Sequence, residues 1–188
     1  MPFHKTELPG LMIFEPSVLE DSRGYFFEAY NEKIFQNAGI PFKFIQDNQS
    51  GSSYGVIRGL HYQLNPYAQT KLVRVLSGKI LDIAVDIRKG SPCFGKSFYI
   101  ELSDENKKQL LIPPGFAHGF SVISEKAIIL YKCNNFYNKE SEGGIRYDDP
   151  ALNIDWQIQA GKEIVSEKDQ QLPLLQGCKN NFEFAGQW

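Results

Sequence analysis

Short runs of aromatic and β-branched residues, separated by turn-forming residues, fill most of the chain between positions 24 and 133. Six such runs read as β-strands and span residues 24–30, 71–76, 79–87, 97–102, 116–122 and 127–133. Turn sequences such as Ser77-Gly78 lie between them. Several short strands at this spacing, with few helical stretches, predict an all-β sandwich or barrel.

The clearest hairpin joins two of these runs across Ser77-Gly78. In its second strand, residues 80–87, the odd-numbered positions are all apolar and share one face, because successive side chains of a strand point to opposite sides. The even-numbered face carries Asp82 and Asp86. We expect the first face to pack in the core, and the second to line a cavity or meet water.

Helical signals are few. A short helix is expected over residues 32–38, because Asn31 suits its N-cap and Gly39 and Pro41 stop it. No internal repeat, low-complexity tract or linker divides the sequence, and 188 residues suffice for one substantial core. We therefore expect a single domain over residues 1–188, with a C-terminal tail from about residue 177 that the sequence leaves unassigned.

The composition excludes several functional classes. Hydrophobic residues make up 42% of the chain and charged residues 22%, as in ordinary soluble globular proteins. A formal net charge of -2 provides no general basic surface for nucleic acid, so any anion site must be a local cluster of cations. The amino terminus lacks the apolar run of a signal peptide, and no apolar stretch is long enough for a membrane span. We expect a cytoplasmic protein without membrane contact.

The cysteines carry no pattern of their own. Cys93, Cys133 and Cys178 are odd in number, widely spaced and without a CxxC pair. Neither a disulfide framework nor a thiolate metal site is favoured by this spacing. We expect three free thiols.

One motif combines a titratable imidazole with permanent cations. Arg58-Gly59-Leu60-His61-Tyr62 is followed by Lys71-Leu72-Val73-Arg74. Histidine titrates near neutral pH and can act as a general base, and a cation beside a developing oxyanion stabilises the transition state. The pattern suits removal of a proton beside a carbonyl group. From these residues alone, a strand-edge histidine beside ordinary surface lysines is the commoner alternative.

The spacing of Arg58 and His61 makes a structural prediction. On a regular strand, residues three apart face opposite sides, so the two side chains would not share a pocket. Gly59 lies between them and could host a bulge that turns both into one cavity. We therefore predict an irregular strand at Gly59.

Five sequence blocks occur in order along the chain: Arg58 to Gln63, Lys71 to Arg74, Asp82 to Arg88, Ile112 to Phe120 and Ser166 to Asp169. Together they resemble the dTDP-4-dehydrorhamnose 3,5-epimerase family, and the similarity runs from about Phe14 to Leu175. The resemblance implies an all-β cupin-type jelly roll, or double-stranded β-helix, with a few short peripheral helices. It also implies a homodimer whose amino-terminal strands cross between subunits.

The resemblance implies an activity as well. Members of the family act without a cofactor and epimerise C3 and C5 of dTDP-4-dehydro-6-deoxy-D-glucose to dTDP-4-dehydro-L-rhamnose, in dTDP-L-rhamnose biosynthesis. His61 matches the base and Asp169 the carboxylate that orients it, while Tyr131 matches the proton donor. Lys71 and Arg58 can share the enolate oxygen and the nearby phosphates.

The remaining matched positions concern substrate binding. The full set comprises Arg23, Glu28, Gln46, Asn48, Arg58, Lys71, His118, Tyr137, Glu142 and Lys168. Tyr137 is the residue expected to stack on the thymine ring, and Arg23 and Glu28 are expected to complete the neighbouring subunit's pocket. Asp47 lies between two of these residues, but alternation points it to the other face.

Ordinary structural roles stand beside these functional ones. The segment from Ser166 to Asp169 also reads as a capping box that starts a helical turn. Tyr131 could be a buried tyrosine whose hydroxyl finds a backbone partner, and His118 a satisfied histidine on an aromatic core face. Arg23 and Glu28 could form an exposed pair of little energetic consequence.

Other functions stay open at this level. Single-carbon epimerases and ketoisomerases acting on related nucleotide 4-keto-6-deoxy sugars share the scaffold and similar bases, and are the main alternative. A non-catalytic sugar-nucleotide binding protein is a further one. A metal-dependent oxygenase or isomerase would need clustered imidazoles and a carboxylate, whereas the chain has three histidines in all. Two positions depart from the family pattern, Thr70 before Lys71 and Phe136 before Tyr137.

Overall fold

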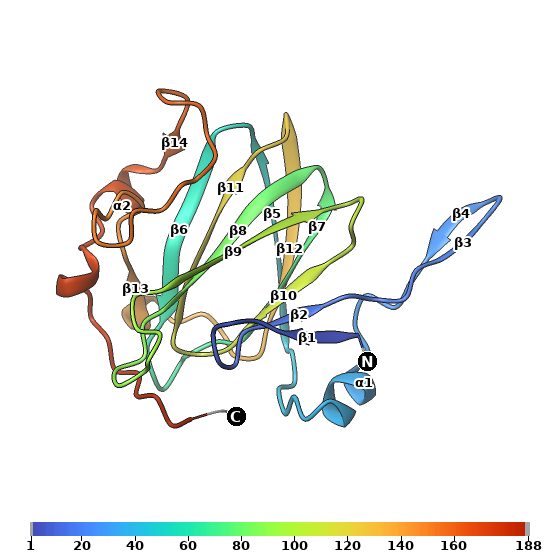
Figure 1. The fold of residues 1–188 in the computed structure, drawn as a ribbon, viewed down its shortest axis with the longest axis horizontal. Coiled ribbons are helices and arrows are strands. Elements are labelled where there is room, and N and C mark those ends of the chain that lie inside the picture. Colours follow the sequence, from blue (N-terminus) through green and yellow to red (C-terminus); the bar gives the residue numbers. More distant parts are fainter. Residues whose placement is uncertain (1, 187–188) are drawn as a thin grey trace.

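Two antiparallel β-sheets face each other in the computed structural model, which describes residues 2–186 (Figure 1). The first sheet has the order β1 (Phe3–Lys5), β2 (Met12–Phe14), β10 (Gln109–Ile112), β7 (Lys71–Ser77), β12 (Lys126–Cys133) and β5 (Gln46–Ser53). The second has the order β13 (Glu142–Gly144), β6 (Val56–Gln63), β11 (Phe116–Val122), β8 (Lys79–Asp86) and β9 (Ser97–Ser103). A short strand, β14 (Ile164–Val165), also pairs with β6, in parallel. The predicted all-β jelly roll is confirmed.

Two hydrophobic cores cover the two faces of the second sheet. The core between the sheets contains Ala84 and Phe120 with residues of β7, β10 and β12. The other contains Ile83, Trp156 and Phe182 and lies under the C-terminal segment. Strand β8 is therefore buried on both faces, and its acidic residues do not meet water. Asp82 and Asp86 each have 0% exposed surface.

The predicted strands agree with β7, β8, β9, β11 and β12 to within one or two residues. The strand predicted over residues 24–30 is wrong beyond Phe26, because β4 (Gly24–Phe26) pairs only with β3 (Leu19–Asp21). This two-stranded hairpin projects away from the sheets (Figure 1). Strand β5 was not signalled, because its sequence is polar and its extended conformation depends on pairing with β12 along its whole length.

The helices are short and capped as their sequences predict. Helix α1 (Glu32–Asn37) begins after Asn31, whose side chain accepts a hydrogen bond from the Lys33 backbone N–H, and Ala38 is its C-cap. Helix α2 (Glu167–Gln170) begins after Ser166. Two 3-10 turns follow β12 and α2 along the chain, η1 (Lys139–Ser141) and η2 (Leu175–Gly177). No helix within the described part of the chain is both long and apolar enough to cross a membrane.

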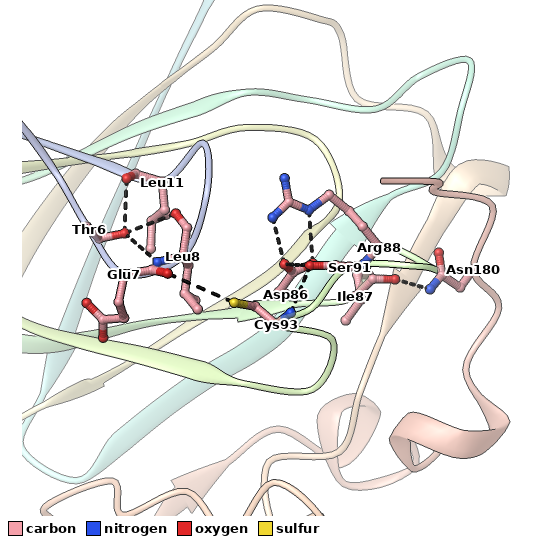
Figure 2. Close-up of polar contacts among 10 residues, drawn as sticks. All are labelled: Thr6, Glu7, Leu8, Leu11, Asp86, Ile87, Arg88, Ser91, Cys93 and Asn180. Carbon is pink, nitrogen blue, oxygen red and sulfur yellow. Dashed lines mark hydrogen bonds and ion pairs between the residues drawn. The ribbon is translucent and has the colours of Figure 1, made fainter. Parts of the chain in front are cut away.

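The tail after η2, unassigned from sequence, is part of the fold. Lys89 donates its backbone N–H to the Phe182 carbonyl at 3.0 Å and accepts one from Phe184 at 2.9 Å. Asn180 donates its side-chain amide to the Ile87 carbonyl (Figure 2). Phe182 is buried at 4% exposure. The tail therefore packs over the end of the second sheet where β8 terminates.

Candidate active site

The candidate catalytic side chains line one cavity of about 460 Å³. Lys71 and Tyr131 enter it from β7 and β12 of the first sheet, and His61 and His118 from β6 and β11 of the second. Asp169 on α2 completes the wall. The structure thus brings together residues that lie up to 108 positions apart in the sequence.

His61 and Asp169 form a hydrogen-bonded pair. The distance from His61 Nε2 to Asp169 Oδ1 is 2.8 Å, and the Gly59 backbone N–H donates to Asp169 Oδ2 at 3.3 Å. Because a carboxylate can only accept, the imidazole carries a proton on Nε2. In the neutral ring Nδ1 is then bare and can act as a base. The His61 side chain is 32% exposed, so a ligand can reach it.

The charge state of Asp169 suits this pairing. Burial raises the pKa of Asp169, but hydrogen bonds and attraction from His61, with further hydrogen bonds from Gly59 and Ser166, outweigh burial and leave the pKa below its ordinary value. The backbone N–H of Asp169 donates to Ser166 Oγ at 3.1 Å. The helix cap and the histidine contact are therefore compatible, because one uses the backbone and the other the side chain.

The predicted irregularity at Gly59 is confirmed. His118 lies opposite His61, whereas Phe120 lies opposite Arg58. An interval of three residues on β6 is therefore paired with an interval of two on β11, which is a β-bulge. Gly59 has a φ of 118°, and a Cβ there would lie 2.6 Å from Gly119 Cα, which leaves room only for glycine. The bulge allows Arg58 and His61 to line the same cavity.

Lys71 offers an unpaired ammonium group to the cavity. Its Nζ makes no hydrogen bond or ion pair with any residue from 2 to 186. Loss of solvation lowers the pKa of Lys71, and attraction by Cys133, Asp82 and Glu142 opposes that shift only in part. An ammonium without a protein partner is suited to meet an anionic oxygen of a ligand.

Tyr131 keeps its proton and leaves its hydroxyl available. Burial, with repulsion from Cys133, raises the pKa of Tyr131 despite the opposing effect of Arg58. The hydroxyl has no hydrogen-bonding partner within the described residues, so it does not have the backbone partner of a structural tyrosine. A neutral phenol in this position can donate its proton to a carbanion.

A second cavity of about 180 Å³ adjoins the first and shares His61, Lys71 and Tyr131 with it. Four of the residues expected at the nucleotide line it, namely Gln46, Asn48, Tyr137 and Glu142. Gln46 Nε2 donates to Asn48 Oδ1 at 3.0 Å. Asp47 points to the other face, as alternation predicts, and pairs with Lys132 at 2.9 Å.

Glu142 lines the second cavity and is hydrogen-bonded to two other residues. Lys168 Nζ donates to the two Glu142 oxygens at 2.6 and 2.7 Å, and the Tyr137 hydroxyl donates to Glu142 Oε2 at 3.0 Å. Burial raises the pKa of Glu142, but these hydrogen bonds outweigh it and lower the pKa overall. Arg58 lines the first cavity and donates to Ser52 Oγ at 3.1 Å.

Arg23 and Glu28 do not reach these cavities within the same chain. Arg23 lies in the β3–β4 turn, pairs with Asp21 at 2.5 Å and has 88% of its side chain exposed. Glu28 accepts a hydrogen bond from Asn31 Nδ2 at 3.1 Å. The structure of one chain therefore gathers eight of the ten expected binding residues and leaves these two outside.

The sequence patterns did not connect two further polar residues, Asp82 and Cys133, with the candidate site. Asp82 accepts a hydrogen bond from His118 Nε2 at 2.8 Å, and Cys133 Sγ accepts one from Asn48 Nδ2 at 3.7 Å. Alternation puts Asp82 on the polar face of β8 but names no partner for it. The three cysteines are free thiols, as expected. Within residues 2–186, no cluster of three or more His, Cys, Asp or Glu side chains is arranged to hold a metal ion.

Comparisons with known proteins identify the family of the chain. The family model for dTDP-4-dehydrorhamnose 3,5-epimerase matches residues 5–177. A dTDP-4-dehydrorhamnose 3,5-epimerase from Shigella flexneri is 55% identical over 166 residues, which cover 88% of this chain and 91% of that protein. The crystal structure of the enzyme of the same name from Elizabethkingia anophelis has a TM-score of 0.88 at 53% identity, with 93% and 96% of the two chains covered. A 3,5-epimerase from Legionella pneumophila, in complex with dTDP-4-keto-L-rhamnose, has a TM-score of 0.89 at 46% identity, with 93% of each chain covered. This chain belongs to the dTDP-4-dehydrorhamnose 3,5-epimerase family.

Proposed function

We propose that the protein epimerises C3 and C5 of dTDP-4-dehydro-6-deoxy-D-glucose, without a cofactor, and forms dTDP-4-dehydro-L-rhamnose for dTDP-L-rhamnose biosynthesis. The observation that carries the proposal is the placement of four groups around one cavity. The cavity is lined by the His61 imidazole, which the buried Asp169 carboxylate orients. It is also lined by the Lys71 ammonium and the Tyr131 phenol, both unpaired among residues 2–186. These are the groups that proton abstraction beside a ketone requires.

The first step uses His61 and Lys71. Nδ1 of His61 removes the proton from the carbon beside the C4 ketone, and the electron pair of the broken C–H bond passes to the ketone oxygen. Lys71 stabilises the enolate oxygen that forms. Asp169 stabilises the imidazolium, since its carboxylate is bonded to the other ring nitrogen at 2.8 Å.

Inversion then requires a proton from the opposite side of the sugar ring. Tyr131 comes from β12 of the first sheet, whereas His61 comes from β6 of the second, so the two approach the cavity from different walls. The phenol gives its proton to the carbanion, and the C=O bond reforms at C4. Both carbons that flank the ketone can react in this way, because the same enolate chemistry applies to each.

The neighbouring residues provide a site for the nucleotide. Gln46 and Asn48 present amides to the edge of a base, and the exposed Tyr137 ring can stack on its face. Arg58 and Lys168 provide cations for the diphosphate. A cytoplasmic location is part of the proposal and is supported by the three free thiols.

The active form in this proposal is a homodimer in which Arg23 and Glu28 complete the neighbour's site. The exposed apolar side chains of the β3–β4 hairpin support a partner on this hairpin: Leu19 is 68% exposed and Phe26 is 67% exposed. A hairpin of this size has little stability without further packing. Mixed dimers of Arg23→Ala and His61→Ala chains test the idea, because one of their two sites would be intact. Each variant alone should be inactive, and activity should appear when the two are mixed. Absence of activity in a sample shown to contain mixed dimers would contradict the shared site.

The test of the reaction is incubation with dTDP-4-dehydro-6-deoxy-D-glucose in heavy water, followed by NMR. Deuterium at both C3 and C5, with the L-rhamno product, is the expected result. Deuterium at one carbon would assign the protein to the single-carbon epimerases or ketoisomerases. Binding of the sugar nucleotide without any exchange would leave a non-catalytic binding protein.

A further inference from the structure

A second histidine–carboxylate pair lies beside the first. Strand β11 runs between β6 and β8, and His118 on it lies opposite His61 on one side and Ala84 on the other. His118 Nε2 is 2.8 Å from Asp82 Oδ1. His118 lines the cavity that holds His61, Lys71 and Tyr131, whereas Asp82 lies behind it.

Asp82 is buried in an unusual way for an acidic residue. Its side chain is 0% exposed, and Oδ2 has no hydrogen-bonding partner among residues 2–186. Burying a carboxylate costs free energy unless it is fully paired, so a core of ordinary packing would be more stable with an apolar residue at this position. The one side chain bonded to Asp82 is His118, which lines the adjacent cavity, so the placement of Asp82 bears on that cavity.

The hydrogen bond to Asp82 decides which nitrogen of His118 faces a ligand. A carboxylate only accepts hydrogen bonds, so Nε2 carries a proton, and the ring makes no second hydrogen bond within the described residues. Burial lowers the pKa of His118, helped by repulsion from Lys71 and His61, although Asp82 opposes the shift. In the neutral ring Nδ1 is a bare acceptor.

We propose that Asp82 is a positioning residue that fixes the tautomer of His118, so that Nδ1 accepts a hydrogen bond from a hydroxyl group of the substrate's sugar ring. The inference rests on the proposed function, because it presumes a nucleotide sugar. A hydroxyl of the sugar rather than of the nucleoside is assigned because His118 lines the first cavity and not the one around Gln46 and Asn48. Arg58 and Lys168, the cations proposed for the diphosphate, line the same cavity but only donate hydrogen bonds, so an acceptor at His118 adds a different specificity.

The test combines NMR and binding on the full chain. In the wild-type protein, 15N spectra of the imidazoles should show the Nε2–H tautomer for His118. In Asp82→Asn the amide can donate to Nε2, and the signals should change to the Nδ1–H tautomer. The affinity for dTDP-glucose, a probe that lacks the ketone and does not react, should then fall about tenfold, while that for dTDP alone stays the same.

Two controls separate positioning from a general loss of structure. Asp149 is buried to 2% exposure and accepts from the backbone of Ala151 and Leu175, away from both cavities, so Asp149→Asn should lower stability without changing the His118 tautomer or dTDP-glucose binding. In a His118→Ala background, Asp82→Asn should cause no further loss of dTDP-glucose affinity.

The proposal is overturned by any of three results. An Nδ1–H tautomer in the wild-type protein, an Asp82→Asn protein that keeps the Nε2–H tautomer, or equal losses of dTDP and dTDP-glucose affinity would each contradict it. These measurements involve no turnover. If one of these three results is found while epimerisation is intact, only the role of Asp82 is wrong. If the proposed function is wrong, the heavy-water experiment shows it independently.

Discussion

Strand β8 carries two buried aspartates in opposite states, Asp86 at its closed end, over which the tail packs, and Asp82 beside the cavity. At the closed end, Asp86 accepts from the Arg88 guanidinium at 2.9 and 2.6 Å and from Ser91 Oγ at 2.7 Å (Figure 2). The Arg88 guanidinium also lies over the Phe116 ring, 4.5 Å from its centroid. Beside the cavity, in the middle of the strand, Asp82 has one partner, and its second oxygen has none among residues 2–186. Both are fully buried. The carboxylate in the closed end is paired through both oxygens, whereas the one beside the proposed substrate cavity is paired through one.

The largest expected effect concerns the closed end. Arg88→Met keeps the length of the side chain but leaves the buried Asp86 without a cationic partner, and breaking a buried ion pair in this way costs about 3–5 kcal/mol of unfolding free energy. Urea unfolding measures it. The exposed Arg146, paired with Asp148, provides the control, and Arg146→Met should cost less than about 1 kcal/mol. Activity per folded molecule should stay unchanged in Arg88→Met; a specific loss of kcat there would blur the distinction between the closed end and the cavity.

The next effect concerns the cavity. Lys71→Met removes the cation proposed at the enolate oxygen, and kcat should fall about 10²–10³-fold, the usual effect of losing one oxyanion donor. Stability should rise or stay constant, because a partly desolvated ammonium is lost. Lys132 lies on the adjacent strand and pairs with Asp47 on the other face, so Lys132→Met should retain full activity. Equal losses from both substitutions would contradict a specific role of Lys71.

Tyr131→Phe separates proton removal from proton delivery. We expect turnover to fall by about 10²-fold, because a general acid is lost, while exchange of the substrate proton with solvent persists through His61. NMR in heavy water follows both quantities in one sample. If product formed at the wild-type rate, the donor would have to be another group.

The smallest effect is a pH dependence of stability. Because the folded-state pKa of Asp169 is lowered, its ionised form stabilises the fold above the unfolded pKa of about 4, and this contribution is lost as the pH falls through the lower folded value. Asp169→Asn should therefore cost about 1 kcal/mol at pH 7 and progressively less as the pH falls below about 4. Urea unfolding at several pH values measures the difference. A constant difference across this range would show that the carboxylate is not stabilised by its partners.

Local sequence patterns were sufficient for much of the fold. Alternation and turn residues predict β7, β8 and β11 closely, and the spacing around Gly59 predicts the bulge that turns Arg58 and His61 into one cavity. Both signals work because they depend on near neighbours in the chain. The polar strand β5 and the tail that packs on Lys89 depend instead on distant partners, so no local pattern reveals them.

The same limit applies to the candidate site. The motif around His61 and Lys71 indicates the chemistry, and the resemblance to a family assigns Asp169 and Tyr131, which no spacing would connect. Asp82 was missed because its partner, 36 positions away, becomes its neighbour only through the pairing of β8 with β11. Arg23 lies outside the cavity of its own chain, so the role proposed for it depends on a second copy of the chain.

The most direct test of the account is hydrogen exchange in His61→Asn. The variant, the wild-type protein and dTDP-4-dehydro-6-deoxy-D-glucose are incubated in heavy water, and NMR follows deuterium at C3 and C5 while dTDP-glucose titration confirms that the variant still binds. If His61 is the base, deuterium should appear at both carbons with the wild-type protein and at neither with the variant. Exchange at either carbon at the wild-type rate in His61→Asn would show that another group removes the proton, and would contradict the account.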